Sequence, residues 1–139
     1  MILVDTNVIS EPLRREPSAA VVEWLDAQHV ETLFLSAVSL AELRFGVAAL
    51  PEGRGRDWLH QGIEQRVVPL FRGRILPFDD AASKAYASLC ARARAAGNAI
   101  AVADGYIAAT AEANGLIVAA RDVAPFKALG LRVIDPWAR

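Results

Sequence analysis

The sequence predicts an α/β protein with a parallel central sheet covered by helices on both faces. Short, uninterrupted apolar runs such as 2–4 and 116–119 are typical of strands buried on both faces of a parallel sheet. Segments with helical periodicity lie between these runs, and this alternation favours parallel pairing. The 139 residues are 54% hydrophobic, which is enough to build one core, so we expect a single domain over residues 1–139.

The first half of the chain is expected to hold two strands and three helices. Ile2, Leu3 and Val4 form the first strand, and polar residues 5–7 then cap a helix or shape a turn. Leu33-Phe34-Leu35 is the second strand, and Ser36 or Ser39 caps the helix after it. The three helices are expected at about 19–28, from the serine cap to about 50, and at about 56–71.

The second half repeats the alternation of strands and helices. A short extended piece is expected at 75–78, after which Asp79 or Asp80 caps a long alanine-rich helix that ends at Gly97. A further helix at 101–114 is closed by Gly115. The remaining elements are a strand at 116–119, a short helix at 123–129 and a last strand at 131–134.

Composition excludes several classes of protein. The single cysteine, Cys90, rules out an intramolecular disulfide and a thiolate zinc cluster. The apolar run at the N-terminus is only four residues long, and no stretch approaches the ~20 residues of a membrane span, so we expect a cytoplasmic protein without a membrane partner. A net charge of −1 gives no global basic footprint, although 13 of the 15 cations are arginines, which bind phosphate well.

Four carboxylates stand among apolar residues, where a charge is costly to bury. They are Asp5, Glu42, Asp104 and Asp122. A buried charge is normally paired, neutralised or bound to a metal, and few cations are placed to pair with all four. Each follows an expected strand or lies near the start of an expected helix, and sites of open parallel sheets form beyond the carboxyl ends of the strands. A shared divalent ion would satisfy the four together.

Oxygen ligands favour Mg²⁺ or Mn²⁺. The chain has only two histidines, His29 and His60, and both stand among polar residues, so zinc is not expected. Magnesium held by carboxylates generally serves phosphate chemistry, where it orients a phosphodiester, generates the attacking hydroxide and stabilises the leaving oxygen.

Each carboxylate also has a purely structural explanation. Asp5 can cap a helix or shape a turn, and Asp122 can cap the short helix after it. Glu42 can be a solvated residue paired with Arg44, and Asp104 can favour the helix dipole. Because a capping carboxylate can also bind metal, the spacing alone leaves both interpretations open.

The same residues carry a resemblance to a known family. Four segments resemble a PIN-domain protein, and most of all the FitB-related subgroup of the VapC toxins of bacterial toxin–antitoxin pairs. They occur in the family's order between about residues 2 and 137. The segments are Val4-Asp5-Thr6-Asn7-Val8, residues 36–46, residues 103–111 and Asp135-Pro136-Trp137.

The resemblance implies an α/β/α sandwich and an Mg²⁺- or Mn²⁺-dependent ribonuclease. By motif position, Asp5 and Asp104 match the firmest metal-binding carboxylates, Glu42 the second acidic position and Asp122 the more variable fourth. Thr6 matches a hydroxyl residue that holds the first carboxylate or a water. The chain departs from the family at Ala120, where a threonine is frequent, and at Ser39, where threonine is commoner. The resemblance also implies a homodimer and a hetero-oligomer with a VapB-like antitoxin.

The sequence therefore predicts a toxin that cleaves RNA phosphodiesters, with Asp5 and Asp104 binding the metal directly. Glu42 and Asp122 complete the catalytic site directly or through water. Arg44 contacts substrate phosphates or forms a salt bridge within the cluster, and the same two roles are open for Arg121. An antitoxin cation inserted among the carboxylates would inhibit. The alternative is a catalytically silent PIN fold that binds RNA or a partner protein. The RNA cleaved and the number of metals stay open.

Overall fold

Five strands form one all-parallel sheet in the computed structural model, which describes residues 1–138. Their order is β3-β2-β1-β4-β5, so β1 lies at the centre, where Leu3 is opposite Phe34 of β2 and Val118 of β4. The sheet confirms the predicted α/β class. Arg139, the last residue of the expected domain, lies outside the described residues. The strands are β1 (Ile2–Val4), β2 (Leu33–Ser36), β3 (Ile75–Leu76), β4 (Ile117–Ala119) and β5 (Val133–Ile134).

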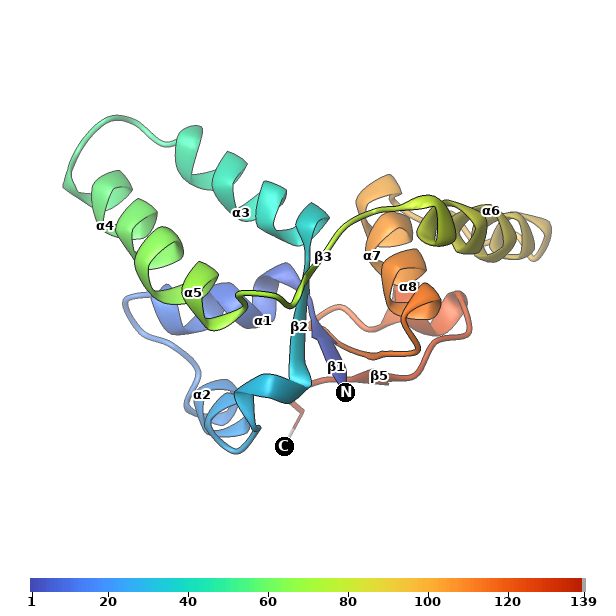
Figure 1. The fold of residues 1–139 in the computed structure, drawn as a ribbon, viewed down its shortest axis with the longest axis horizontal. Helices are drawn as coiled ribbons and strands as arrows, with labels where there is room; N and C mark the ends of the chain where they lie inside the picture. Colours follow the sequence, from blue (N-terminus) through green and yellow to red (C-terminus); the bar gives the residue numbers. More distant parts are fainter. Residues whose placement is uncertain (139) are drawn as a thin grey trace.

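Helices cover both faces of this sheet, as Figure 1 shows. On one face lie α1 (Thr6–Ser10), α2 (Ala19–Asp26), α3 (Ala37–Ala48), α4 (Arg54–Gly62) and α5 (Val68–Leu70). On the other face lie α6 (Asp80–Ala95), α7 (Val102–Ala113) and α8 (Ala124–Ala128). Short helical turns lie at η1 (Glu11–Leu13), η2 (Val30–Thr32) and η3 (Ile63–Val67), of which η3 is a π-helix.

The sheet divides the hydrophobic core into two clusters. Because neighbouring strand residues point to opposite faces, Leu3 and Val118 join the cluster beneath α6–α8, whereas Val4 and Ala119 join the cluster beneath α1–α5. All four side chains are fully buried. This two-sided burial explains why the central strands are continuous apolar runs rather than alternating ones.

Side chains at the helix ends settle two alternatives that the sequence left open. Ser36 caps α3, because its hydroxyl accepts the Ser39 backbone N–H at 2.9 Å. Asp79 caps α6 by accepting the Ala82 backbone N–H at 3.0 Å. Gly115 follows α7 with a φ of 65°, the left-handed conformation expected where a helix ends on glycine.

The structure differs from the sequence-based elements in two places. Residues 6–13, for which only a cap or a turn at 5–7 was expected, form α1 and η1. The helix expected at 56–71 is interrupted by the π-turn η3, which directly precedes the turn with Pro69, a residue that cannot donate to the carbonyl four residues before it. The extended piece expected at 75–78 is confirmed at 75–76, where β3 joins the sheet. Among residues 1–138, no helix is both long and apolar enough to cross a bilayer.

Helices α6 and α7 approach each other closely at Gly105. A Cβ atom at this position would lie 2.9 Å from Cε2 of Tyr86 and 3.2 Å from Sγ of Cys90. The Tyr86 ring cannot simply swing away, because it stacks at 5.0 Å on Tyr106, which in turn contacts Phe78 at 4.7 Å. Gly105 therefore sets how closely α6 packs against the first turns of α7.

We expect Gly105→Ala to lower the free energy of unfolding by up to about 2 kcal/mol. Overpacking costs roughly 1–3 kcal/mol, and the better helix propensity of alanine returns about 1 kcal/mol of it. The matched control is Gly46→Ala in α3, where a Cβ meets nothing within 4 Å. That variant should be neutral or more stable. Urea denaturation of both proteins measures the difference, and equal stability of the two variants would contradict the packing described here.

Candidate functional site

The predicted site residues lie around the carboxyl ends of the two central strands. Asp5 directly follows β1, and its backbone N–H donates to the Ala119 carbonyl at the end of β4, at 2.8 Å. The strand order reverses direction between β1 and β4, since β2 and β3 lie on one side and β5 on the other. Such a reversal opens a crevice in parallel sheets, and ligands bind there.

Asp5 is a buried carboxylate at the start of α1. Its side chain is the N-cap of that helix, with Oδ1 accepting the Thr6 backbone N–H at 2.8 Å, and only 8% of the residue is exposed. The pKa of Asp5 is raised from 3.8 to about 6, mainly by burial and then by the nearby charges of Asp104 and Glu42, while hydrogen bonds from Thr6 partly oppose the rise. The capping role that the sequence suggested for Asp5 is present.

Thr6 connects Asp5 to Glu42. The threonine hydroxyl donates to Oε1 of Glu42 at 2.8 Å, while its backbone N–H bonds to Asp5. Glu42 lies in the second turn of α3 and is exposed, so its other oxygen, Oε2, faces solvent. The pairing of Glu42 with Arg44 considered from the sequence does not occur.

Asp104 lies in the first turn of α7 and is half-buried. Its pKa is raised mainly by burial, and then by the charges of Glu42 and Asp122. Asp122 is exposed in the turn after β4. The capping role considered for Asp122 is wrong, because α8 has Val123 at its N-cap position and no side-chain cap.

The structure thus brings the four predicted carboxylates into one electrostatic cluster, in which Asp104 and Glu42 raise the pKa of Asp5, and Glu42 and Asp122 raise the pKa of Asp104. One premise from the sequence needs correction. Glu42 and Asp122 are exposed, although their neighbours in the sequence are apolar, and only Asp5 is truly buried. The cluster has no cationic partner within residues 1–138, since the three ion pairs there are Arg14–Glu11, Arg44–Glu64 and Lys84–Asp80.

The donor set fits a hard divalent cation. All four groups are carboxylates, two have raised pKa values, and a bound cation would relieve the repulsion that raises them. Within the described residues, no three acidic, histidine or cysteine side chains lie close enough to hold one ion together. Mg²⁺ needs no such cage, because it usually keeps several waters and takes one or two carboxylates directly.

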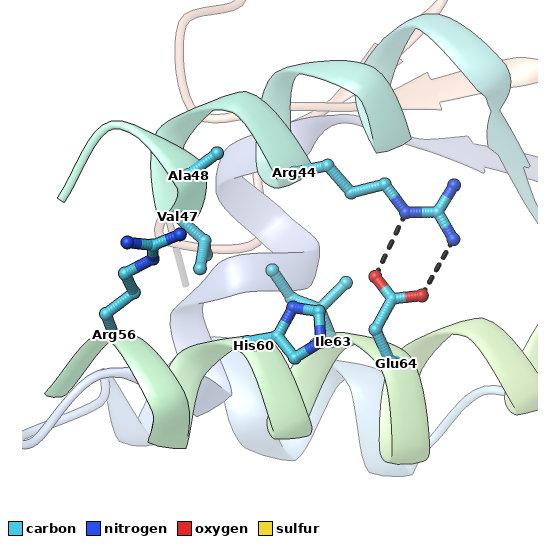
Figure 2. Close-up of a pocket in the computed structure, with 7 residues that line it drawn as sticks. All are labelled: Arg44, Val47, Ala48, Arg56, His60, Ile63 and Glu64. Atoms are coloured by element: carbon cyan, nitrogen blue, oxygen red, sulfur yellow. Dashed lines mark hydrogen bonds and ion pairs between the residues drawn. The ribbon is translucent and has the colours of Figure 1, made fainter. Parts of the chain in front are cut away.

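Arg44 points away from this cluster. Its guanidinium donates to both carboxylate oxygens of Glu64, at 3.0 and 2.8 Å, and so ties α3 to η3. Figure 2 shows this pair at one end of a pocket of about 570 Å³ between α3 and α4, with Arg56 at the other end and His60 between them. The pocket contains none of the four carboxylates. The sequence allowed a salt bridge between Arg44 and the acidic cluster. Arg44 instead pairs with Glu64 on the other side of α3.

Arg121, directly before Asp122, also stays outside any ion pair among residues 1–138. Its guanidinium lies 5.2 Å from the centre of the Trp137 ring, a cation–π contact. Trp137 is itself fixed by a hydrogen bond from its backbone N–H to Asp135 at 2.9 Å. The charge of Arg121 is therefore not neutralised by a carboxylate.

Sequence reasoning missed a groove that begins at the cluster. Thr6 and Glu42 form one end of an open groove of about 1100 Å³, which continues between α1 and η1 on one side and α3 and α4 on the other. Its far part includes Arg14, Arg54 and Trp58. The only signal in the sequence is the mixture of arginine and aromatic residues at 54–58, which has no regular spacing.

The structure is that of an α/β protein with a parallel sheet and with carboxylates gathered beyond its central strands. Comparison with known proteins gives the family. The model of the PIN domain matches residues 2–130. The chain therefore belongs to the PIN-domain family, as its resemblance implied.

Full-length relatives place the chain more narrowly. It is 56% identical to the plasmid stability protein StbB of Pseudomonas syringae pv. tomato, over 99% of both chains. It is 55% identical to the VapC ribonuclease Y4jK of Sinorhizobium fredii, over 99% of this chain and 98% of the relative. It is 52% identical to the toxin FitB of Neisseria gonorrhoeae, again over 99% of both. Within the PIN-domain family, the chain is a VapC-type ribonuclease toxin.

Solved structures agree with this assignment. The crystal structure of FitAcB from Neisseria gonorrhoeae contains a chain with a TM-score of 0.96 and 51% identity, and the alignment covers 100% of both chains. The structure of FitAB bound to a DNA fragment gives the same TM-score at 50% identity, over 100% of this chain and 97% of the other. The predicted PIN-like sandwich is confirmed.

The buried carboxylate of Asp5 predicts a pH dependence in metal-free protein. Native Asp5 keeps its proton up to a pH of about 6, whereas unfolded Asp5 loses it near 3.8. The native state therefore binds more protons between these values, and Asp5 lowers the free energy of unfolding as pH rises through that range. Asp5→Asn removes this pH-dependent loss of stability and keeps a capping side chain. Above pH 6 the free energy of unfolding of the variant should exceed that of wild type by up to about 3 kcal/mol.

Urea denaturation in EDTA at pH 4 and pH 7.5 measures this difference. The stability gap between variant and wild type should be small at the lower pH and large at the higher one. Mg²⁺ should close the gap by stabilising the wild type alone. A gap that does not change with pH would show that Asp5 ionises as an ordinary carboxyl group.

Proposed function

We propose that this ribonuclease toxin is an endoribonuclease that uses Mg²⁺ or Mn²⁺, held by Asp5 and Asp104, to cleave RNA phosphodiesters. The observation that supports the proposal most strongly is the cluster itself: four carboxylates, of which Asp5 and Asp104 have raised pKa values, with no cationic partner within residues 1–138. Such a cluster lowers the stability of the metal-free protein and favours binding of a divalent ion.

In this proposal, each acidic residue has a distinct role. Asp5 is the most rigid ligand, because its backbone is fixed to β4 and its side chain to the start of α1. Asp104 faces it from the first turn of α7, where the helix dipole favours an anion. Glu42 and Asp122 are exposed and complete the site directly or through water.

The bound ion would supply Lewis-acid activation of the phosphodiester and of the attacking water. The chain's own groups would position that water and take its proton. The Thr6 hydroxyl holds Oε1 of Glu42 and so leaves Oε2 free to accept a hydrogen bond from a water at the edge of the cluster. We assign Thr6 this orienting role rather than a direct contact with the substrate; its motif position implied that it holds a carboxylate or a water.

Arg121 is the better of the two arginine candidates for contact with the substrate. Its guanidinium is fixed over Trp137 without being neutralised, and it neighbours Asp122 in the chain. Arg44 already donates two hydrogen bonds to the Glu64 carboxylate. We therefore propose that Arg121 contacts a phosphate oxygen of the RNA, and that Arg44 supports the packing of α3 on η3.

We further propose a VapB-like antitoxin as the natural inhibitor and a homodimer as the form of the toxin. The DNA-bound structure of FitAB, a chain of which is 50% identical to this one, supports an assembly of the same kind. An antitoxin that inserts a cation among the four carboxylates would relieve the same repulsion between them as the metal does, and it would displace the metal.

Asp104→Asn should abolish metal-dependent RNA cleavage and growth arrest while the fold stays intact. The amide removes the charge that holds the ion, and the half-exposed position in the first turn of a helix tolerates the change. Cleavage of total RNA with and without Mn²⁺ measures the first effect, and induction in cells measures the second.

The matched control is Asp80→Asn, which also removes an acid from the first turn of a helix but lies in an exposed pair with Lys84. It should keep full activity. Undiminished cleavage by the Asp104→Asn protein would contradict the proposed site. If the wild type itself cleaves no RNA with either ion, the rival function, a silent PIN fold that only binds, is favoured.

A further inference from the structure

The groove that begins at Thr6 and Glu42 has the chemistry of a single-stranded RNA surface. Its walls are mainly apolar, formed by side chains of η1, α3 and α4, and arginines stand on both sides of it. RNA bases have apolar faces, and the backbone has one negative charge per nucleotide, so a bound strand needs both kinds of contact. Because the groove opens on the carboxylate cluster, a strand cleaved there can continue along it.

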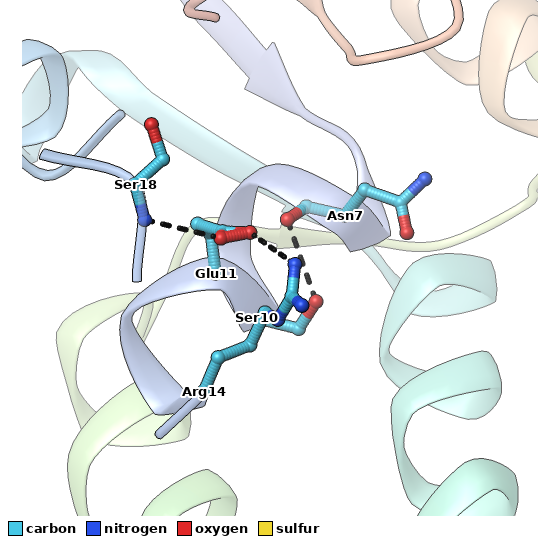
Figure 3. A network of polar contacts seen from close by, with 5 residues as sticks. All are labelled: Asn7, Ser10, Glu11, Arg14 and Ser18. Atoms are coloured by element: carbon cyan, nitrogen blue, oxygen red, sulfur yellow. Dashed lines mark hydrogen bonds and ion pairs between the residues drawn. The ribbon is translucent and has the colours of Figure 1, made fainter. Parts of the chain in front are cut away.

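Arg14 is fixed in this groove by a buried acid. Glu11 is only 2% exposed, and its Oε1 accepts from Nη1 of Arg14 at 3.2 Å. The second oxygen of Glu11 accepts the Ser18 backbone N–H at 3.4 Å, so the carboxylate is tied to the start of α2 as well (Figure 3). The Arg14 side chain nevertheless stays 61% exposed. Its guanidinium is thus oriented by Glu11 and open to an anionic ligand.

Trp58 offers an aromatic surface in the same groove. The residue is 49% exposed, whereas Leu59, the other large apolar residue of α4, packs against the core. The guanidinium of Arg66 lies 5.5 Å from the centre of the Trp58 ring. Positive charge therefore stands beside an exposed indole, the combination on which unpaired bases stack. Arg54 lies one helical turn before Trp58 and also lines the groove.

We propose that this groove binds the single-stranded RNA that flanks the cleaved phosphodiester, with Trp58 stacking on a base and Arg14 and Arg54 contacting phosphates. Glu11 is a positioning residue that orients Arg14. The inference rests on the proposed ribonuclease activity and adds the location of the flanking strand. It makes substrate affinity depend on residues that take no part in the chemistry.

Trp58→Ala tests the stacking contact. For a single-stranded RNA of about twelve nucleotides, we expect KM to rise about tenfold with kcat nearly unchanged, since stacking on one aromatic ring contributes roughly that factor or more. Trp58→Phe should restore most of the affinity. Leu70→Ala is the control, because Leu70 is 54% exposed on the same helical segment but does not line the groove. Mn²⁺ binding should be equal in all these proteins.

The salt dependence of RNA binding tests the contacts of the arginines with phosphates. Arg54→Ala should weaken RNA binding and make its dependence on salt shallower by about one phosphate contact, whereas Trp58→Ala should leave that dependence unchanged. Arg14→Ala should have the same effect on RNA binding. Because this variant leaves Glu11 unpaired, thermal melting checks that the protein is still folded. Arg92→Ala, on the exposed end of α6, is the matched control. Binding is measured by fluorescence anisotropy in the inactive Asp104→Asn background.

The outcomes separate this inference from the function on which it rests. If wild type cleaves RNA but Trp58→Ala and Arg54→Ala bind it as tightly as the controls do, the groove does not carry RNA and the inference is wrong. If these variants bind RNA normally but are inhibited less by the antitoxin, the inference is also wrong, and the groove binds a protein segment instead. If wild type cleaves no RNA, the proposed function fails first.

Discussion

The structure depends on one costly feature, a buried carboxylate at the junction of its two central strands. Asp5 ends β1, bonds through its backbone to the end of β4, and begins α1 with its side chain. The position is fixed by hydrogen bonds that any α/β fold would need at this point, but the charge is not neutralised by any of them. Burial and the neighbouring acids Glu42 and Asp104 raise its pKa to about 6. The fold therefore holds an acidic cluster that is unfavourable until a cation is added.

The surrounding architecture maintains this cluster. The two hydrophobic clusters on either side of the sheet keep the ends of β1 and β4 together. Gly105 lets α6 pack directly against the first turns of α7, which position Asp104. Thr6 ties Glu42 to the same centre from α3. These contacts bring acidic residues from separate parts of the chain near one another beyond the ends of β1 and β4.

The sequence was sufficient for the strands and for the long helices, because burial on both faces and helical periodicity both leave strong patterns. It failed at α1, which has only five residues and no repeating apolar stripe. Short helices form only through tertiary contacts, and these are not visible in a local pattern. The π-turn at η3 was missed for the same reason.

The candidate site was predicted well in position and less well in environment. Asp5 is buried as expected, but Glu42 and Asp122 are exposed despite their apolar neighbours. On a helix, adjacent residues point in different directions, so an acid can face solvent while the next side chain enters the core. Arg44 shows the same limit, because it lies two residues from Glu42 and points to the opposite side of α3. The groove along Trp58 depends on residues of α1, η1, α3 and α4 and left no periodic signal.

The most direct test of the shared cation site is calorimetric titration of Mn²⁺ into wild type and into the double variant Asp5→Asn, Asp104→Asn. The four clustered carboxylates predict that wild type binds the ion and that the double variant, which lacks the two principal ligands, does not. Equal binding by both proteins, or no binding by the wild type, would contradict the assignment of these carboxylates as a metal site.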